Sequence, residues 1–282
     1  MPELPEVETM RRGILPIVGA RIAGVTVPRS RYKPISIAPR LPAFRRRAVG
    51  QQITGVSRIG KRVVVELEND DRIVFEPRMT GLVLLAAPPT DEHCRVRIAL
   101  ADISGDQGGP NELLYWDRRG LGSVRLFSIQ ELAARFADRA IGPDALRVSP
   151  DELRERLCAS PRPIKVALLD QKTLAGVGNL YASEILHLAR VHPARRCNTL
   201  RRADWQRVHA ALREVLEAAI RHEGSTLSDG TYRNALNQSG GYQNHHRVYD
   251  RAGQPCPTCG HEVQRIVQAQ RSTFFCPTCQ HR

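Results

Sequence analysis

Two Cys-x-x-Cys motifs near the end of the chain constrain its fold more than any other feature. They are Cys256-Pro257-Thr258-Cys259 and Cys276-Pro277-Thr278-Cys279, and residues 260–275 lie between them. This spacing lets two turns face each other across a β-hairpin and present four thiolates tetrahedrally to Zn²⁺, whereas a redox or disulfide pair rarely takes this matched form. Four thiolates leave no position open for a substrate. We therefore expect one structural zinc ion in a zinc-ribbon hairpin over residues 254–282.

The charge of the chain predicts a polyanionic partner. Its 282 residues include 42 Lys and Arg against 29 Asp and Glu, a formal net charge of +13. Nucleic acid is the leading partner for such a surface, and an anionic membrane follows. There is no run of about 18 apolar residues and no apolar leader behind a basic segment, so neither a membrane span nor a secretory signal is predicted. We expect a cytoplasmic protein without disulfides, in which the scattered Cys94, Cys158 and Cys197 are ordinary thiols.

The first half of the chain has the pattern of an all-β domain. Short runs rich in β-branched and aromatic residues recur roughly every ten residues, with turn signals such as Asn69-Asp70 between them. These runs are Ala20–Val27, Gln51–Val56, Lys61–Glu68, Arg72–Phe75, Leu82–Ala86, Arg95–Leu100, Glu112–Trp116 and Ser123–Phe127. Such a series predicts a β-sandwich or barrel. The alternation after Arg95 predicts that Arg95 and Arg97 share one wet, positive face.

The second half has a helical pattern. A capping box of Ser128 and Glu131 opens a helix to Ala137, and Ile141–Asp144 has the composition of a linker. Further helices are predicted from Ser149 to about Ala159, over Ile164–Leu169 and Asn179–Ala189, and along the apolar stripe from Trp205 to Ile220 that Gly224 ends. Ser225–Arg251 lacks apolar periodicity and is either mobile or a cover for a substrate. We expect an α+β chain with domains at 1–139, 140–253 and 254–282.

The first residues could carry a nucleophile. Removal of Met1, which a small second residue permits, leaves Pro2 with a free secondary amine and Glu3 beside it. An α-amino group titrates near pH 8, roughly, so a useful fraction is uncharged and nucleophilic at neutral pH. Pro5 and Glu6 suit the first turn of a helix, which would hold this end in place. The same residues also need no explanation beyond starting a helix.

Several basic and glycine-rich turns could bind phosphate, although each is weak evidence when taken alone. Lys61 follows Gly60 at a strand start, Asn179 ends the glycine-rich entry to a helix, and Arg271 lies between the cysteine motifs. A guanidinium or free backbone N–H groups at such places can bind phosphate, although each is also an ordinary surface feature. The turns Glu76–Gly81 and Asp117–Gly122 combine arginine with an apolar residue, a pairing that can wedge into a duplex while holding its backbone.

Taken together and in this order, the motifs resemble the formamidopyrimidine-DNA glycosylase family, base-excision enzymes related to endonuclease VIII. The resemblance runs nearly from end to end, and several separated motifs are more specific than any one. The segments that carry it are Pro2–Glu8, Lys61, Arg78–Gly81, Asp117–Gly122, Gly176–Glu184, the cysteine motifs and Arg271–Phe274. The opening Pro2–Glu8 is closer to the purine-lesion branch than to the pyrimidine-lesion branch.

The resemblance implies a DNA glycosylase and AP lyase that acts on oxidised purines such as 8-oxoguanine in duplex DNA. Pro2 would attack the sugar C1′ of the damaged nucleotide, Glu3 would handle protons, and Lys61 with Arg271 would grip the flanking phosphates. Further DNA contacts are implied for His93, Asn179, Lys165 and Arg162. Met79, Arg119 and Leu121 match residues that fill the gap left by the everted nucleotide.

The family also implies the architecture and the partners. We expect a leading helix and β-sandwich, a helix-two-turns-helix domain, a lid over residues 225–251, and a monomer that binds double-stranded DNA at the nucleoid. The chain departs from the family pattern at Leu121, where an aromatic is usual, at Glu76-Pro77, where His-Leu is common, and at Pro161, where a lysine often lies. Glu76 should need Arg78 or another cation as partner. The alternatives are an oxidised-pyrimidine glycosylase of the endonuclease VIII type and a non-catalytic zinc-ribbon protein that binds damaged DNA.

Overall fold

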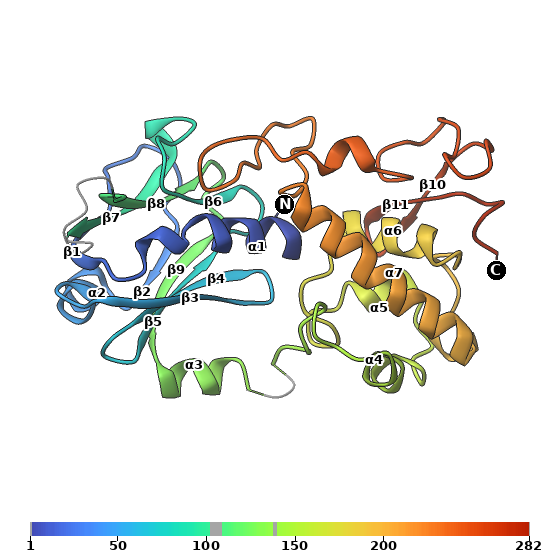
Figure 1. The fold of residues 1–282 in the computed structure, drawn as a ribbon, viewed down its shortest axis with the longest axis horizontal. Helices are drawn as coiled ribbons and strands as arrows, with labels where there is room; N and C mark the ends of the chain where they lie inside the picture. The colour runs from blue at the N-terminus through green and yellow to red at the C-terminus, as the bar shows by residue number, and fades with distance from the viewer. Residues whose placement is uncertain (1, 102–108, 138–139, 282) are drawn as a thin grey trace. The chain divides into compact units, whose positions relative to one another are not determined.

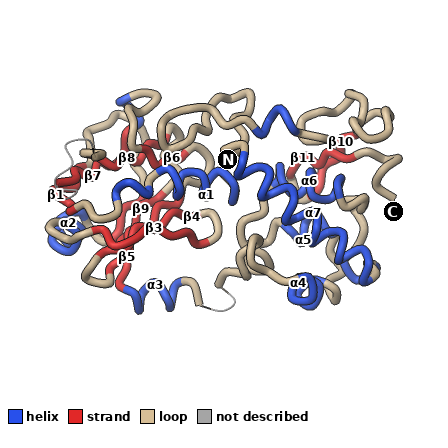
Figure 2. The backbone as a smooth tube through the Cα atoms, viewed as in Figure 1, coloured by secondary structure: helices blue, strands red, loops and turns tan. Residues whose placement is uncertain are grey.

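The structure, a computed structural model, describes residues 2–101, 109–137 and 140–281. The chain forms two compact units, Met1–Ala137 with His222–Gly241, and Asp138–Arg221 with Tyr242–Arg282. Strands dominate the first unit and helices the second (Figure 2). Residues 222–241 belong to the first unit although they follow the long helix of the second. The three domain ranges expected from the sequence remain predictions.

The first unit contains the predicted β-sandwich, built from two sheets (Figure 1). One sheet has the order β1-β7-β8-β6 and the other has the order β2-β9-β5-β4-β3. The strands are β1 (Arg21–Thr26), β2 (Ser36–Ala38), β3 (Ile53–Ile59), β4 (Arg62–Leu67), β5 (Asp71–Glu76), β6 (Gly81–Leu84), β7 (Cys94–Ala101), β8 (Glu112–Asp117) and β9 (Ser123–Ser128). All eight predicted runs are strands. β2 was not predicted because three residues are too few to show alternation.

Helix α1 (Leu4–Gly13) packs against strands of both sheets, namely β3 and β4 of one and β6 of the other. Leu4, Val7 and Met10 are fully buried on it. Its charged face is held by Glu8, whose carboxylate accepts hydrogen bonds from Arg11, Arg12 and Arg58 at 2.9–3.1 Å. Burial raises the pKa of Glu8, but the arginine hydrogen bonds outweigh it and keep the pKa below the ordinary value. Helix α1 is therefore fixed on the sandwich.

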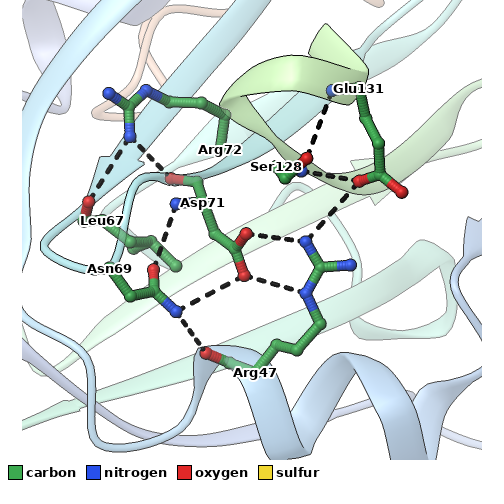
Figure 3. Close-up of polar contacts among 7 residues, drawn as sticks. All are labelled: Arg47, Leu67, Asn69, Asp71, Arg72, Ser128 and Glu131. Carbon is green, nitrogen blue, oxygen red and sulfur yellow. Dashed lines mark hydrogen bonds and ion pairs between the residues drawn. The ribbon is translucent and has the colours of Figure 1, made fainter.

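Two short helices, α2 (Leu41–Ala48) and α3 (Ile129–Arg135), are tied to the start of strand β5 by one arginine (Figure 3). Arg47 donates two hydrogen bonds to the carboxylate of Asp71, at 2.9 and 2.6 Å, and lies 3.6 Å from Glu131. Glu131 and Ser128 form the predicted capping box of α3. The bidentate pair with Asp71 joins α2 to β5, and the contact with Glu131 adds α3 to the same group.

One prediction about the sandwich was wrong. Arg95 does not lie on a wet face but is buried, with an exposed fraction of 3%. The register of β7 against β8 shifts between Cys94 and Val96, and such a bulge turns a side chain away from the face that strict alternation gives it. Arg97, beyond the bulge, is half-buried and pairs with Asp91 and Glu112.

The second unit contains the predicted helical bundle and zinc-ribbon hairpin. Its helices are α4 (Pro150–Leu157), α5 (Ile164–Leu168), α6 (Asn179–Leu188) and α7 (Arg202–Arg221), and its strands are β10 (Gln264–Gln268) and β11 (Arg271–Phe275). α6 packs against α5, α7 and β11, so one helix links the bundle to the hairpin. The apolar stripe of α7 from Trp205 to Ile220 is buried as predicted. Short 3-10 helices cover Leu15–Ile17, Asp91–His93, Cys197–Thr199 and Tyr242–His245. Within the described ranges, each helix is too short or too polar to cross a membrane.

Candidate active site and metal centre

The first two described residues are buried in the first unit. Pro2 and Glu3 are both buried, and Glu3 is the N-cap residue of α1. The N–H of Glu3 donates to Oε2 of Glu6 at 2.9 Å. Oε1 of Glu6 accepts the N–H of Ser225 at 2.9 Å. One carboxylate thus connects the residues expected to be reactive with the segment His222–Gly241.

This segment, which is most of the expected lid, is anchored on the first unit. Tyr232 and Ala235 belong to the sandwich core, and the N–H of Leu85 donates to the carbonyl of Ala235 at 2.9 Å. The hydroxyl of Tyr232 donates to the carbonyl of Glu223 at 3.0 Å. Burial, and then the nearby Glu6, raise the pKa of Tyr232, so its hydroxyl stays a donor. Residues 242–251 belong instead to the second unit.

Met79 and Leu121 are among the large apolar side chains of the first unit that lie at the surface. Met79, after β5, and Leu121, between β8 and β9, are both 37% exposed, and Arg119 is exposed as well. Glu76, the last residue of β5, lies three residues before Met79. Arg62 donates a hydrogen bond to the carboxylate of Glu76 at 3.0 Å, and Arg78 lies 3.6 Å from the same carboxylate. The expected cationic partner of Glu76 is confirmed, and two arginines fill that role.

Lys61 and His93 occupy different environments in the same unit. Lys61 lies half-buried at the turn between β3 and β4. His93 is buried between aromatic rings, 4.6 Å from Tyr32 and 5.6 Å from Trp116 between ring centroids. Burial lowers the pKa of His93, so the imidazole is neutral near pH 7 and can act as a hydrogen-bond donor or acceptor.

In the second unit, Lys165 and Asn179 hold the start of β11. Lys165 is buried, and its ammonium group donates to Oδ1 of Asn179, the carbonyl of Ser272 and the hydroxyl of Thr273, at 2.7–2.9 Å. Asn179 donates to the same carbonyl at 3.0 Å. Arg271, the neighbour of Ser272, is exposed. Lys165 therefore fixes the backbone beside Arg271, while Arg162 lies partly exposed in an ion pair with Asp170.

The four predicted zinc ligands come together. The Sγ atoms of Cys256, Cys259, Cys276 and Cys279 all lie within 4.8 Å of one another. A tetrahedron with Zn–S bonds of about 2.3 Å requires S–S separations of about 3.8 Å, so the cluster fits one zinc ion. Backbone N–H groups of Thr258 and Cys279 point at two of the sulfurs from 3.4 Å, which stabilises thiolates.

The face of α6 supports this cluster. Nε2 of His187 lies 3.3 Å from Sγ of Cys256. One turn earlier, the fully buried carboxylate of Glu184 accepts the backbone N–H groups of Arg247, Val248 and Tyr249 at 2.8, 3.0 and 2.8 Å. Metal sites depend on such outer contacts for the orientation of their ligands.

Comparisons with known proteins agree with this geometry over the whole chain. The formamidopyrimidine-DNA glycosylase N-terminal domain matches residues 1–124, the H2TH domain of the same glycosylases matches 140–231, and the zinc finger found in FPG and IleRS matches 253–282. A formamidopyrimidine-DNA glycosylase of Chloroflexus aurantiacus is 40% identical over 281 residues, which is 99% of this chain and 98% of that protein. This chain belongs to the formamidopyrimidine-DNA glycosylase family.

Solved structures of the family have the same fold. The Lactococcus lactis Fpg in complex with DNA containing an abasic site matches with a TM-score of 0.87 and 34% identity, over 99% of this chain and 100% of that one. The MutM (FPG) protein of Thermus thermophilus matches with a TM-score of 0.84 and 37% identity, over 99% and 98%. The helical part of this chain is thus the family's H2TH domain, and the cysteine cluster is the family's zinc finger.

Sequence reasoning missed three buried carboxylates that organise this member of the family. Glu6 was assigned only to the first turn of α1, although its position three residues after Glu3 is that of a capping box. Asp117 and Glu184 were named only as parts of longer motifs, with no role of their own. Their importance comes from the backbone N–H groups around them, which a sequence does not display.

Proposed function

We propose that the chain removes oxidised purines, such as 8-oxoguanine and formamidopyrimidines, from duplex DNA and then cleaves the strand at the abasic site. The observation that carries this proposal is the buried Pro2-Glu3 pair directly before α1, in a chain that matches the family from end to end. The net charge of +13 supports a DNA substrate.

The chemistry follows from a free amine at Pro2. Its nitrogen forms a bond to C1′ of the damaged nucleotide as the glycosidic bond breaks and the base leaves with a proton, which Glu3 helps to transfer. The C1′–O4′ bond of the sugar then breaks, O4′ takes up the proton that the nitrogen loses, and the resulting iminium ion makes the C2′ proton acidic. Loss of that proton expels the 3′ phosphate, and a second elimination expels the 5′ phosphate. One nucleophile thus performs both base removal and strand cleavage.

Basic and polar side chains bind the phosphates of the DNA. Lys61 and the exposed Arg271 bind the phosphates beside the lesion. His93 and Asn179 add contacts to the DNA backbone, and Arg162 adds another beside Pro161, the position where the family often has a lysine. Lys165 acts indirectly, because its ammonium group is buried and donates hydrogen bonds to Asn179, Ser272 and Thr273. Its contribution to phosphate binding is the placement of Arg271.

The exposed Met79 and Leu121 enter the gap left by the everted nucleotide, and Arg119 faces the opposite base. Leu121 cannot stack as an aromatic would, so its contribution is apolar contact. Cys256, Cys259, Cys276 and Cys279 hold one structural zinc ion that keeps the Arg271 hairpin rigid. Such an enzyme works on chromosomal DNA inside the cell, at the nucleoid.

Borohydride trapping tests the nucleophile. Incubated with an 8-oxoguanine duplex and sodium borohydride, the protein should form a covalent adduct, because reduction of the iminium ion leaves a stable amine bond to the DNA. Peptide mass mapping should place that bond on Pro2. A chain with one glycine inserted before Pro2 is the control, since its proline nitrogen is an amide and should give no adduct. Equal trapping of both chains would refute the assignment.

Substrate preference needs its own measurement. Excision is compared between duplexes with 8-oxoguanine and with thymine glycol under single-turnover conditions. We expect faster release of 8-oxoguanine. A clear preference for thymine glycol would instead assign the chain to the oxidised-pyrimidine activity of endonuclease VIII.

A further inference from the structure

The exposed Met79 and Leu121 come from loops of neighbouring strands. β6 and β8 are antiparallel, and Gly81 at the start of β6 faces Asp117 at the end of β8. Met79 lies two residues before Gly81, and Leu121 lies four residues after Asp117. The strand pairing therefore brings the bases of both loops together at one end of the sheet.

A single buried carboxylate is bonded to both loops. Asp117 has no exposed surface, and its Oδ1 accepts the hydroxyl of Thr80 at 2.5 Å and the N–H of Arg119 at 3.2 Å. Its Oδ2 accepts the N–H of Gly122 at 2.8 Å. The hydroxyl of Thr80 also accepts the N–H of Arg119, at 3.0 Å. Thr80 follows Met79 directly, while Arg119 and Gly122 flank Leu121.

The same place is supported from the interior of the sandwich. Nε of the buried Arg95 donates to the carbonyl of Asp117 at 2.8 Å. The hydroxyl of Tyr115 donates to the carbonyl of Glu76 at 3.0 Å. The backbone of Gly122 packs closely on that hydroxyl, since a Cβ atom there would lie only 1.8 Å from it. Both loops thus rest on a filled, hydrogen-bonded base.

We propose that Asp117, acting through Thr80, is a positioning residue that holds Met79 and Leu121 as one rigid two-pronged wedge. The proposal rests on the role in gap filling proposed above for these two side chains. A wedge must enter a base stack whose opening costs free energy, and prongs that are already ordered lose little conformational entropy when they enter. This matters more here because Leu121 lacks the stacking surface of an aromatic residue.

Thr80→Val tests the proposal, because it removes the hydroxyl and keeps the shape. Thr80→Ser keeps the hydroxyl and is the matched control. Each is measured in single turnover on an 8-oxoguanine duplex, whose damaged base must be extruded, and on an abasic duplex, which has no base to extrude. We expect Thr80→Val to slow 8-oxoguanine excision by about 10- to 100-fold, the loss that a misplacement of about 1 Å can cause. Abasic-site cleavage should change little, and Thr80→Ser should behave as the unchanged protein does.

The outcomes separate this proposal from the gap-filling role itself. Met79→Ala and Leu121→Ala should lower the ratio of 8-oxoguanine to abasic activity, and if neither does, the gap-filling assignment fails. If they lower the ratio but Thr80→Val leaves it unchanged, the Asp117 proposal is overturned. An equal loss on both substrates would also overturn it, because that is the signature of general destabilisation. Should the valine variant unfold in urea at markedly lower concentration, Thr80→Ala, which adds no methyl group beside the carboxylate, replaces it in the same assay.

Discussion

Replacing Glu184 by glutamine should weaken the zinc-bearing unit from a distance. The carboxylate is fully buried on α6 and accepts three backbone N–H groups, those of Arg247, Val248 and Tyr249. Glutamine keeps one oxygen, so at least one N–H loses its acceptor, which costs about 1–3 kcal/mol. The other two bonds change from charge-assisted to neutral and weaken by about 1 kcal/mol each.

Part of this loss is offset. Burial raises the pKa of Glu184 in spite of the three N–H bonds, which means that desolvation opposes the charged form. The neutral amide of glutamine avoids the free-energy cost of burying that charge. We therefore expect a net destabilisation of about 2–3 kcal/mol by glutamine. Val248 packs in the same apolar cluster as Cys256 and Cys276, so the loosened segment should also release zinc faster to a chelator.

Urea unfolding and chelator-driven zinc release measure the two effects in parallel. The matched control is Glu152→Gln on α4, where the carboxylate is 39% exposed in an i,i+4 pair with Arg156 and should contribute less than about 0.5 kcal/mol. Equal stability of the two variants would mean that the three backbone bonds at Glu184 contribute nothing net. Unchanged zinc release at reduced stability would separate this segment from the metal cluster.

Three further predictions address the metal, the acid limit of stability and the packing of the sandwich. Cys256→Ser should lose zinc and DNA binding together, measured by metal analysis and gel shift, and full DNA cleavage by the metal-free protein would contradict a structural role for zinc. Asp204→Asn should destabilise by about 1–2 kcal/mol at pH 7 in urea. Burial raises the pKa of Asp204, but hydrogen bonds to the Arg201 N–H and to Arg195 bring it below the ordinary value, so this stability is present above about pH 4 and lost as pH falls further. If the stability of the unchanged protein and of Asp204→Asn depended equally on pH, the stabilising role of the Asp204 carboxylate would be refuted. Gly122→Ala should cost about 3 kcal/mol in thermal unfolding because its Cβ would overlap the Tyr115 hydroxyl, whereas Gly24→Ala, whose nearest neighbour lies 4.0 Å away, should cost far less.

Local patterns were reliable where one residue type decides the local structure. Ser128 and Ser149 start helices as predicted, because a side-chain oxygen that accepts a free N–H is a local interaction. The eight predicted strands are present because period-two alternation is also local. The prediction for Arg95 was wrong because a bulge in the pairing of β7 with β8, invisible in either strand alone, moves its side chain inside.

The sequence by itself determined the zinc ligands, the order of sandwich, bundle and hairpin, and the family, since each depends on residue types at fixed spacing along the chain. Only the tertiary structure decided what the buried charges do. Lys165 turned out to hold Ser272, Glu6 to hold Ser225, and Asp117 to hold two loops. The physical reason is that a buried charge is defined by the donors and acceptors that replace its water, and these come from distant parts of the chain.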